Sequence, residues 1–529
     1  MRQIRRFFIL SGVLLFFGAS LSLPIGALAQ QQGGYNEIFN PDGSPRPQYK
    51  DIWKIYASMS KTRKKEFLRG SMTDFQGDNE LLPIPRVLTE SEYQELARGV
   101  EQRGRALHAF LTDYYSGKKS FLKANLIPET VLESIFGRNL ESAVGNFLTR
   151  QKIEFWYGPD VIRDSSGNFR VVEDNTGFVG GMGDLVAAKN ILLGRIPEYA
   201  SALTPQGHDP EQFYKNLIDR YKRQAAQYGG EPLLVIYNGD LSADNEDSRV
   251  SATFRKYGVR TLKLDTYDEN KPRKRFQVRD DGLYVNGRKI GLVIVDAESV
   301  DVDPKHPIVR DRFVNSFDGR EDWSNYYLAR KRLGIDGFWN LYLEGKVGCV
   351  NGPGTESIND KQFYLYVEKL IRFYLHEEPI LKNIETQPLA IYPAAGGARL
   401  NRRLLEKVMN HPELYVFKGV NGRGGNQVWI GPKMKPEEIA TLRKEIEADP
   451  THYIVQKYTD LSELDGHIVD LRLLSDVSSD QVIVAPVPWG RATPAGGNGK
   501  VNISSNGKET TVLVIDTAKD CNEILHPIQ

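Results

Sequence analysis

Three oxygen-bearing side chains flank a predicted β-turn in the first third of the chain. Asp160 closes one β-rich run, residues 165–167 form the turn, and Glu173 and Asn175 follow on the returning strand. Because side chains two apart on a strand share a face, we expect these groups to converge across a hairpin. Carboxylate and amide oxygens suit a hard cation such as Mg²⁺. The pattern predicts a magnesium site; the alternative is a solvated turn with surface charges.

A second segment combines a lysine with a glycine-rich loop. Lys418 stands at the end of a predicted strand, and Gly422, Gly424 and Gly425 are among the glycines that follow it. Glycine lets backbone N–H groups approach an anion closely, so the segment predicts a phosphate-binding cradle. The alternative is an ordinary glycine-rich hairpin loop.

These two segments resemble the ATP-grasp superfamily, in which a lysine and a glycine-rich flap hold ATP phosphates against an Asp, Glu and Asn metal site. The metal strands precede the lysine here, which resembles the circularly permuted ATP-grasp proteins of type 2, relatives of the glutathionylspermidine synthetase group. The resemblance runs from about residue 35 to residue 514. Its further segments are YNEIFNPDGSPRPQY (35–49), LARGVEQRGRALHAFLTDYYSG (96–117), NGPGTESINDKQFYLYVEKLIRFYLHEEPIL (351–381), DPTHYIVQ (449–456), VDLR (469–472) and VNISSNGKETTVL (501–513).

The resemblance implies an α+β chain with a circularly permuted ATP-grasp fold and an inserted α/β lobe. It implies a carboxylate–amine ligase that makes an amide or peptide bond through an acyl phosphate, with ATP and Mg²⁺ as cofactors. The expected partners are small-molecule carboxylate and amine substrates, or a peptide. The residues carried over are Asp160, Glu173 and Asn175 for metal; Lys361, Lys418, Gly422, Gly424, Gly425 and Gln456 for nucleotide; and Arg472, Arg491 and Lys508 for catalysis.

Several of these side chains have plainer interpretations. Lys361 follows Asp360 at a predicted helix start, where it binds nucleotide or is a solvated first-turn lysine. Gln456 faces adenine or simply closes its strand. Arg472 lines the phosphate end or forms a structural ion pair with Asp470, two residues earlier on the strand.

The chain departs from the family pattern at two places. Gly177 stands where the family carries an arginine, and VIVDAES (293–299) replaces a strand with paired arginines. Those arginines suit an acyl phosphate or a substrate carboxylate. Their absence favours the alternative of an exported, non-catalytic ATP-grasp-derived protein that binds a small ligand or an envelope partner.

Composition excludes several functional classes. The 69 basic and 68 acidic residues give a net charge of +1 without a long basic run, which argues against nucleic acid or an anionic membrane surface as partner. The eight histidines show no zinc-binding spacing, and no GxSxG motif is present. Cys349 and Cys521 are the two cysteines, and we expect both to be unpaired.

The N-terminus has the pattern of an exported protein. Arg2, Arg5 and Arg6 precede an apolar run over residues 7–23, and a small-x-small sequence ends at Ala29. This order predicts a signal peptide over residues 1–29 and a periplasmic or extracellular location. The alternative is an uncleaved anchor in the inner membrane.

The remaining chain is too long for one compact core, so we expect several units. Apolar strands that alternate with helices between residues 211 and 350 predict a parallel sheet covered by helices. The predicted units are an extended N-terminal arm and opening segment (30–89), a helical segment with the metal strands (90–210), an α/β lobe (211–384) and the lysine and flap lobe (385–529). The predicted helices span about 90–150, 185–193, 211–227, 248–257, 400–410 and 436–448.

Overall fold

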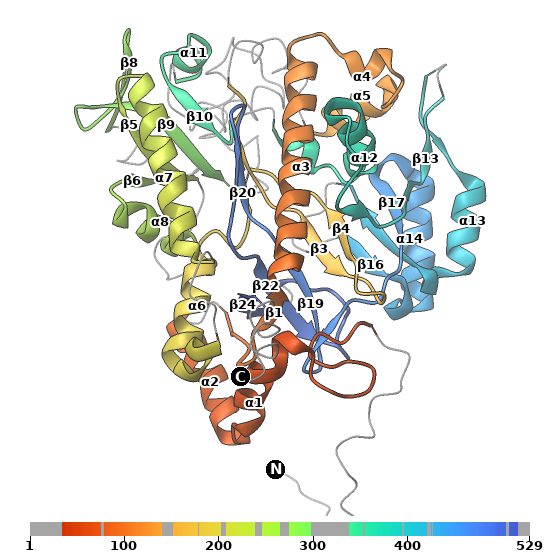
Figure 1. Cartoon of the computed structure of the whole chain (residues 1–529). Helices are drawn as coiled ribbons and strands as arrows, with labels where there is room; N and C mark the ends of the chain where they lie inside the picture. Colours follow the sequence, from red (N-terminus) through yellow and green to blue (C-terminus); the bar gives the residue numbers. More distant parts are fainter. Residues whose placement is uncertain are drawn as a thin grey trace, which may run out of the picture.

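The computed structural model describes residues 34–75, 79–139, 152–177, 179–202, 208–237, 246–264, 275–297, 338–352, 355–393, 396–420, 425, 427–503 and 507–516. The predicted signal peptide, Gly422, Gly424 and Cys521 lie outside these residues. Within them, no helix is both long and apolar enough to cross a bilayer. Figure 1 shows a central body around the long helix α3, with one sheet-and-helix lobe on each side of it.

Helix α3 (Glu90–Tyr115) begins at a strong start signal in the sequence. Thr89 caps it: the Thr89 hydroxyl accepts from the Glu92 N–H at 3.2 Å, and the Glu92 carboxylate accepts from the Thr89 N–H at 2.9 Å. Its buried residues recur every three or four positions, and α12 (Val367–Leu370) and the turn η8 (Ile371–Leu375) pack against it. The predicted helical segment is therefore confirmed from Glu90 to Tyr115. The chain then forms the separate helices α4 (Ser120–Lys123) and α5 (Glu129–Asn139), and the rest of the predicted range, to residue 150, lies outside the described residues.

A seven-stranded central sheet combines strands from both halves of the chain. The path is β11 (Lys382–Asn383), β4 (Phe169–Glu173), β3 (Asp160–Arg163), β19 (His467–Arg472), β22 (Trp489–Pro494) and β23 (Lys508–Thr510), with β18 (Glu463–Leu464) beside β19. The predicted hairpin is present as β3 and β4. Its turn is closed by the Gly167 N–H, which donates to the Asp164 carbonyl at 2.9 Å, and Gly167 has a φ of +86° that favours glycine.

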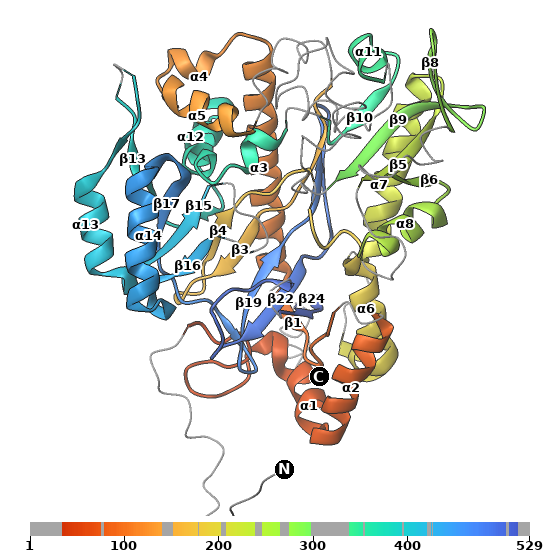
Figure 2. The same ribbon diagram turned by 180° about the vertical axis from the view of Figure 1, so that it is seen from behind.

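A second, antiparallel sheet carries the predicted lysine strand. Its order is β12 (Thr386–Pro388), β17 (Tyr453–Lys457), β15 (Tyr415–Gly419) and β16 (Val428–Ile430). Helices α13 (Arg402–Asn410) and α14 (Pro436–Ala448) cover it, as Figure 2 shows from behind. Their apolar stripes meet the sheet in a separate core that includes Leu405, Phe417 and Ile446. A short hairpin of β13 (Ala390–Ile391) and β14 (Arg399–Leu400) extends from this lobe.

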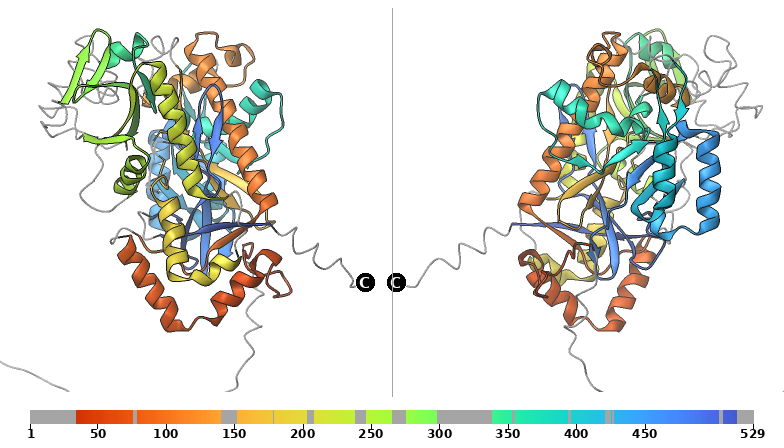
Figure 3. Two further views of the ribbon diagram at one scale, coloured as in Figure 1. Left: turned by 60° about the vertical axis from the view of Figure 1, so that its left-hand side comes forward. Right: turned by 90° about the vertical axis from the view of Figure 1, so that its right-hand side faces the viewer.

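The parallel sheet predicted between residues 211 and 350 is present. Strands β6 (Arg260–Leu264), β5 (Glu231–Tyr237), β9 (Arg288–Ala297) and β10 (Gly348–Val350) pair in parallel, and the hairpin of β7 (Phe276–Arg279) and β8 (Gly282–Val285) adds antiparallel strands. Residues 233–236 and 292–295 are buried without alternation, as expected of strands covered by packed helices. Helices α7 (Pro210–Gln227) and α8 (Glu246–Lys256) contact this sheet (Figure 3).

The N-terminal segment is more helical than its sequence pattern predicts. After the turn η1 (Pro47–Tyr49) come α1 (Lys50–Ser58) and α2 (Lys61–Asp74), which share a core with α6 (Asp184–Arg195). Strand β1 (Arg86–Thr89) pairs in parallel with β24 (Val512–Ile515), so a strand from the N-terminal part of the described chain is joined to its last strand. A three-stranded sheet of β2 (Phe155–Tyr157), β20 (Ser475–Val477) and β21 (Val482–Val484) completes the centre, and α11 (Phe338–Leu343) precedes β10.

Candidate nucleotide and metal site

Asp160 is held by two arginines that come from strands more than 300 residues later. Register places Arg472 of β19 directly opposite Asp160 of β3. The Arg472 Nε and Nη2 atoms donate to the two Asp160 carboxylate oxygens at 2.6 and 3.0 Å, and the Arg491 Nη2 lies 2.9 Å from Asp160 Oδ2. Burial alone would raise the pKa of Asp160, but the two guanidinium groups outweigh it and hold this pKa well below its usual range.

The same face of the sheet carries further charged and aromatic groups. Arg491 also donates to both oxygens of Asp470, at 2.9 and 2.7 Å. Arg472 therefore pairs with Asp160, and the structural Asp470–Arg472 pair considered from sequence gives way to Asp470–Arg491. The guanidinium carbons of Arg472 and Arg491 lie 5.7 and 5.3 Å from the ring centre of Trp489. Trp489 was not predicted, although its position two residues before Arg491 on a strand places it on the same face.

Two lysines reach this face from other elements. Lys418 of β15 is buried, and its Nζ donates to the Val172 carbonyl of β4 at 3.1 Å. The Lys361 Nζ lies 3.5 Å from a Glu173 carboxylate oxygen, and the Lys361 N–H donates to the Val420 carbonyl at 3.0 Å, just past the lysine strand. Burial lowers the pKa of Lys418 to about 8, although the Glu173 carboxylate opposes the shift.

Lys361 stands just before a helical run, as predicted. Asp360 follows the 3₁₀ turn η6 (Glu356–Asn359), and η7 (Phe363–Tyr366) begins three residues later and continues into α12. Lys361 is thus in the short link that precedes the first helical residue, Phe363. Its buried position beside Glu173 excludes the interpretation as a solvated first-turn lysine.

Gln456 links the two sheets at the same point. Its Nε2 donates to the Thr386 hydroxyl at 3.0 Å and to the Val172 carbonyl at 3.4 Å. It lies on β17, in register with Val416 of β15, so its strand position is as predicted and its contact with adenine stays a prediction. Gly425 lies in the loop between β15 and β16 with a φ of +75°, and its carbonyl accepts from Lys500 at 3.1 Å.

Lys508 is not brought to this group. It pairs in register with Ala492, whereas its neighbour Glu509 pairs with Arg491. Because side chains alternate along a strand, Lys508 projects from the opposite face of the sheet, where it forms an ion pair with Glu80. The catalytic role predicted for Lys508 therefore has no support from its position.

The predicted metal ligands offer a suitable donor set for Mg²⁺. Asp160 and Glu173 face each other across the hairpin, at a register shift next to Asp160. Strand β4 ends at Glu173, so the expectation that Asn175 shares this strand was wrong. Asn175 is held by Gly158 instead, because its Nδ2 donates to the Gly158 carbonyl at 3.2 Å; this contact leaves the amide oxygen as the acceptor.

The Asp160 carboxylate keeps an acceptor position for Mg²⁺. A carboxylate has about four acceptor positions. Three guanidinium contacts on Asp160, one to Oδ1 and two to Oδ2, leave a position on Oδ1 for a cation. Asp160, Glu173 and Asn175 would then hold Mg²⁺ with oxygen ligands only, as this ion prefers.

The sequence model of the family described as circularly permuted ATP-grasp type 2 matches residues 85–240 and 321–487. The chain belongs to this ATP-grasp family. The matched residues include every predicted ligand of metal and nucleotide, and Arg472, while Arg491 and Lys508 lie beyond them. ATP-grasp ligases use ATP and Mg²⁺ in general, which agrees with the oxygen donors and lysines assembled at this site.

Similar proteins cover most of this ATP-grasp chain. An uncharacterized protein of Synechocystis is 28% identical over 510 residues, which are 90% of this chain and 97% of that protein. A Frankia alni protein, named provisionally as glutamate–cysteine ligase 2-3, is 25% identical over 89% of this chain, which spans about half (53%) of it. The structure of a glutathione synthetase-like effector of Globodera pallida aligns with a TM-score of 0.49 at 10% identity, over 85% of this chain and 98% of that one.

Proposed function

We propose that the chain is an ATP-dependent carboxylate–amine ligase that forms an amide or peptide bond through an acyl phosphate. One observation carries the proposal: the oxygen donors Asp160, Glu173 and Asn175 lie at the point where Lys418 and Lys361 reach the central sheet. Among the described residues, four cationic side chains, from Lys361, Lys418, Arg472 and Arg491, lie around Asp160, Glu173 and Asp470 there. Such a cluster of cations suits a polyphosphate that arrives with a divalent cation.

The reaction proceeds in two substitutions. A substrate carboxylate oxygen attacks the γ-phosphorus of ATP, the bond to the ADP oxygen breaks, and an acyl phosphate forms. The amine nitrogen then attacks the acyl carbon, phosphate leaves with the bonding electrons, and the amine loses a proton. Bound Mg²⁺ would neutralise charge on the phosphates during the first step.

The chain's own residues bind and orient the reactants. Lys418 and Lys361 would contact phosphate oxygens, which compete with their present partners at Val172 and Glu173. The Arg472 and Arg491 guanidiniums are fixed by Asp160 and by the Trp489 ring, so they need little rearrangement to face a developing negative charge. The loop after Lys418 would exclude water, which otherwise hydrolyses an acyl phosphate.

The substrate class rests on the relatives. The Frankia protein is provisionally named as a glutamate–cysteine ligase, and this chain spans about half of that protein. We therefore propose small carboxylates and amines of the amino-acid type, or a short peptide, as substrates of this chain.

Calorimetric titration of the purified protein with ATP, with and without Mg²⁺, tests this function. We expect ATP binding that tightens when Mg²⁺ is present, followed by phosphate release when a suitable carboxylate and amine are added together. A folded protein that binds no ATP under either condition would contradict the proposal.

A second candidate is an exported protein that binds a small anionic or peptide ligand without catalysis. It is favoured by Gly177, which stands where the family carries an arginine and has a φ of +81°, a conformation that side-chain-bearing residues rarely adopt. The backbone there is built for glycine. ATP binding without any phosphate release would favour this candidate.

The low pKa of Lys418 makes nucleotide binding dependent on pH. Phosphate beside the ammonium favours its charged form, so binding raises the pKa of Lys418 above the value of about 8 in the free protein. The affinity for ATP is then greatest below pH 8, and it falls as pH rises above this value, by up to about tenfold per pH unit. Calorimetry at pH 9 in two buffers of different ionisation enthalpy should detect proton uptake. Lys418→Met should abolish this uptake, and an identical uptake in that variant would contradict the assignment.

A further inference from the structure

The residue between the two predicted ligands Glu173 and Asn175 faces the other way. Asp174 follows the end of β4, and its side chain is fully buried, whereas the Glu173 side chain is 22% exposed. Because successive side chains of an extended chain point to opposite sides, a carboxylate anchored at 174 leaves the Glu173 side chain, at the end of β4, on the other side. Whatever holds Asp174 therefore sets the direction of Glu173 and fixes the backbone that leads to Asn175.

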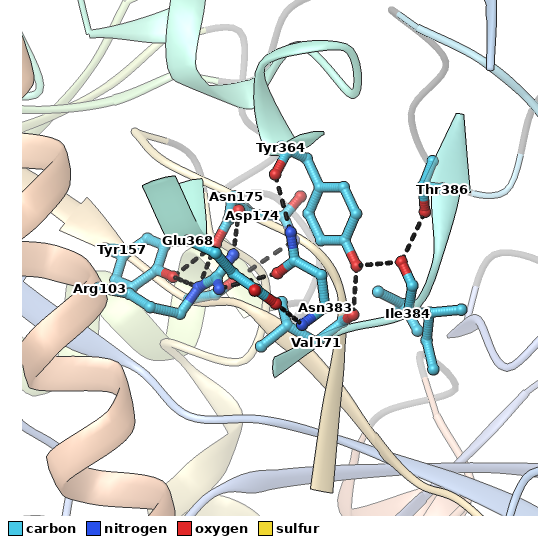
Figure 4. Close-up of polar contacts among 12 residues, drawn as sticks. Arg103, Tyr157, Val171, Asp174, Asn175, Tyr364, Glu368, Asn383, Ile384 and Thr386 are labelled. Atoms are coloured by element: carbon cyan, nitrogen blue, oxygen red, sulfur yellow. Dashed lines mark hydrogen bonds and ion pairs between the residues drawn. The ribbon is translucent and has the colours of Figure 1, made fainter. Parts of the chain in front are cut away.

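Arg103 of α3 is the main partner of Asp174, as Figure 4 shows. Its Nε and Nη2 donate to the two Asp174 oxygens at 3.1 and 2.7 Å, and its side chain is also fully buried. The Tyr157 hydroxyl donates to Asp174 Oδ1 at 2.6 Å. Such two-pronged contact with a planar guanidinium fixes the orientation of a carboxylate as well as its position.

The remaining nitrogen of the Arg103 guanidinium, Nη1, begins a chain of hydrogen bonds that leads back to β4. Nη1 donates to the Asn383 side-chain oxygen at 2.9 Å, and the Asn383 amide donates to the Tyr364 carbonyl at 2.9 Å. The Tyr364 hydroxyl donates in turn to the Val171 carbonyl at 2.6 Å. The strand is thus held at Val171 and at Asp174, on both sides of Glu173.

Asn175 is fixed by the same arrangement. The Gly158 N–H donates to the Asn175 carbonyl at 2.9 Å, and the Asn175 side chain donates back to the Gly158 carbonyl. A Cβ at Gly158 would lie 2.5 Å from a Val179 side-chain carbon and 3.0 Å from an Arg472 side-chain carbon, so a side chain there would displace these neighbours. The adjacent residue is Tyr157, whose hydroxyl holds Asp174.

We propose that Arg103 is a positioning residue for the metal site. It acts through Asp174 and Tyr157 to hold residues 173–175 in the one conformation that turns the Glu173 carboxylate and the Asn175 amide oxygen toward the same cation. The inference deepens the proposed function and rests on it. Arg103 itself lies on the far side of the strand and touches neither predicted ligand side chain in these contacts.

The test measures two properties of the Arg103→Lys variant against the wild type: Mg²⁺ binding and stability. Lysine keeps the charge but cannot make the two-pronged contact. Calorimetric ATP titrations at increasing Mg²⁺ concentration give the Mg²⁺ concentration at which half of the increase in ATP affinity is reached. We expect this concentration to rise about 10- to 100-fold, as for residues that orient metal ligands. ATP binding without Mg²⁺ should change less than the Mg²⁺ requirement, because the described Arg103 hydrogen bonds reach neither Lys418 nor Lys361.

Arg86→Lys is the matched control. Arg86 is equally buried and pairs with Glu37, which also contacts Arg163 at the other end of β3 from Asp160. It should lose thermal stability and keep the Mg²⁺ requirement of the wild type. Tyr157→Phe removes one hydroxyl contact to Asp174 and should shift the Mg²⁺ requirement in the same direction by a smaller factor, which decides the matter if Arg103→Lys does not fold.

The outcomes separate the inference from the function on which it rests. A wild-type protein whose ATP binding ignores Mg²⁺ would overturn the proposed function and the inference with it. A Mg²⁺-dependent wild type with an unchanged Mg²⁺ requirement in folded Arg103→Lys, or in Tyr157→Phe if the first variant is unfolded, would overturn the positioning role alone.

Discussion

Glu173→Gln is expected to abolish the Mg²⁺ dependence of ATP binding while the protein remains folded. Glutamine keeps the shape of the side chain, and the 22% exposure of Glu173 makes the loss of one charge tolerable. The variant loses one of two carboxylate ligands. Because residues that only orient a ligand already change metal affinity by 10- to 100-fold, we expect at least about 100-fold weaker Mg²⁺ binding here.

In the absence of Mg²⁺, Glu173→Gln should bind ATP more tightly than the wild type. Lys361 loses its carboxylate contact at 3.5 Å, so Glu173 no longer competes with phosphate for the ammonium group. The Glu173 charge also supports the protonated form of Lys418, so the variant should show a lower pKa for Lys418 and a pH dependence that begins at lower pH. Calorimetry with and without Mg²⁺ measures both effects.

Lys508→Ala is the control for this experiment. It removes a charge from the opposite face of the same sheet and breaks only the ion pair with Glu80, worth about 1 kcal/mol or less. ATP affinity and Mg²⁺ dependence should match those of the wild type. A Glu173→Gln protein that behaves like Lys508→Ala would remove Glu173 from the metal site.

Asp160→Asn is expected to lower the free energy of unfolding by about 3–5 kcal/mol, because it leaves buried arginines without their charge partner. Among the described residues, Asp160 is the carboxylate that contacts Arg472, and Arg491 would keep Asp470. The measurement is the midpoint of chemical denaturation at neutral pH. The change should be largely independent of Mg²⁺ in the absence of nucleotide.

The pH dependence of this loss has a definite sign. The arginines lower the pKa of Asp160 in the folded protein, so its stabilising contribution is complete above the unfolded-state pKa near 3.9 and is lost as pH falls through the lower folded-state value. The difference between wild type and variant should therefore shrink as pH falls below about 4. A constant difference would contradict the shifted pKa.

Asp164→Asn provides the matched control on the same hairpin. Asp164 accepts the N–H groups of Ser166 and Asn168 and pairs with the partly exposed Arg170. Asparagine can accept the same backbone hydrogen bonds through its side-chain oxygen. We expect a change of about 1 kcal/mol or less, so an equal loss in both variants would show that any charge removed from the hairpin destabilises it.

Local patterns in the sequence determined most of the elements. Helix α14 (Pro436–Ala448) matches its predicted range, and α7, α8 and α13 begin or end within two residues of theirs. The β3–β4 hairpin follows from its Asp-Ser-Ser-Gly turn, and the continuous apolar runs of β5 and β9 gave the parallel sheet. Hydrophobic period, turn residues and helix caps act over a few residues, so they can be read without knowing the partners of an element.

The partners of the charged residues were decided only by the tertiary structure. Asp160 meets Arg472 because β3 and β19 are neighbours in the central sheet, a pairing across 312 residues that no local pattern encodes. The face that each side chain occupies depends on register, and a shift of one residue reverses it. For this reason Lys508 lies opposite the site while Arg491 lies in it, although both were predicted there.

The same reason explains why Arg103 was not recognised. In the sequence it is one of several arginines in a long amphipathic helix, where an arginine is usually solvated. Its position becomes informative only when α3 packs beside the end of β4 and the guanidinium is buried against Asp174. Sequence by itself determined the donor types, the lysine strand and the family; packing across the whole chain decided which charges face one another, because burial makes each unpaired charge costly and each pairing specific.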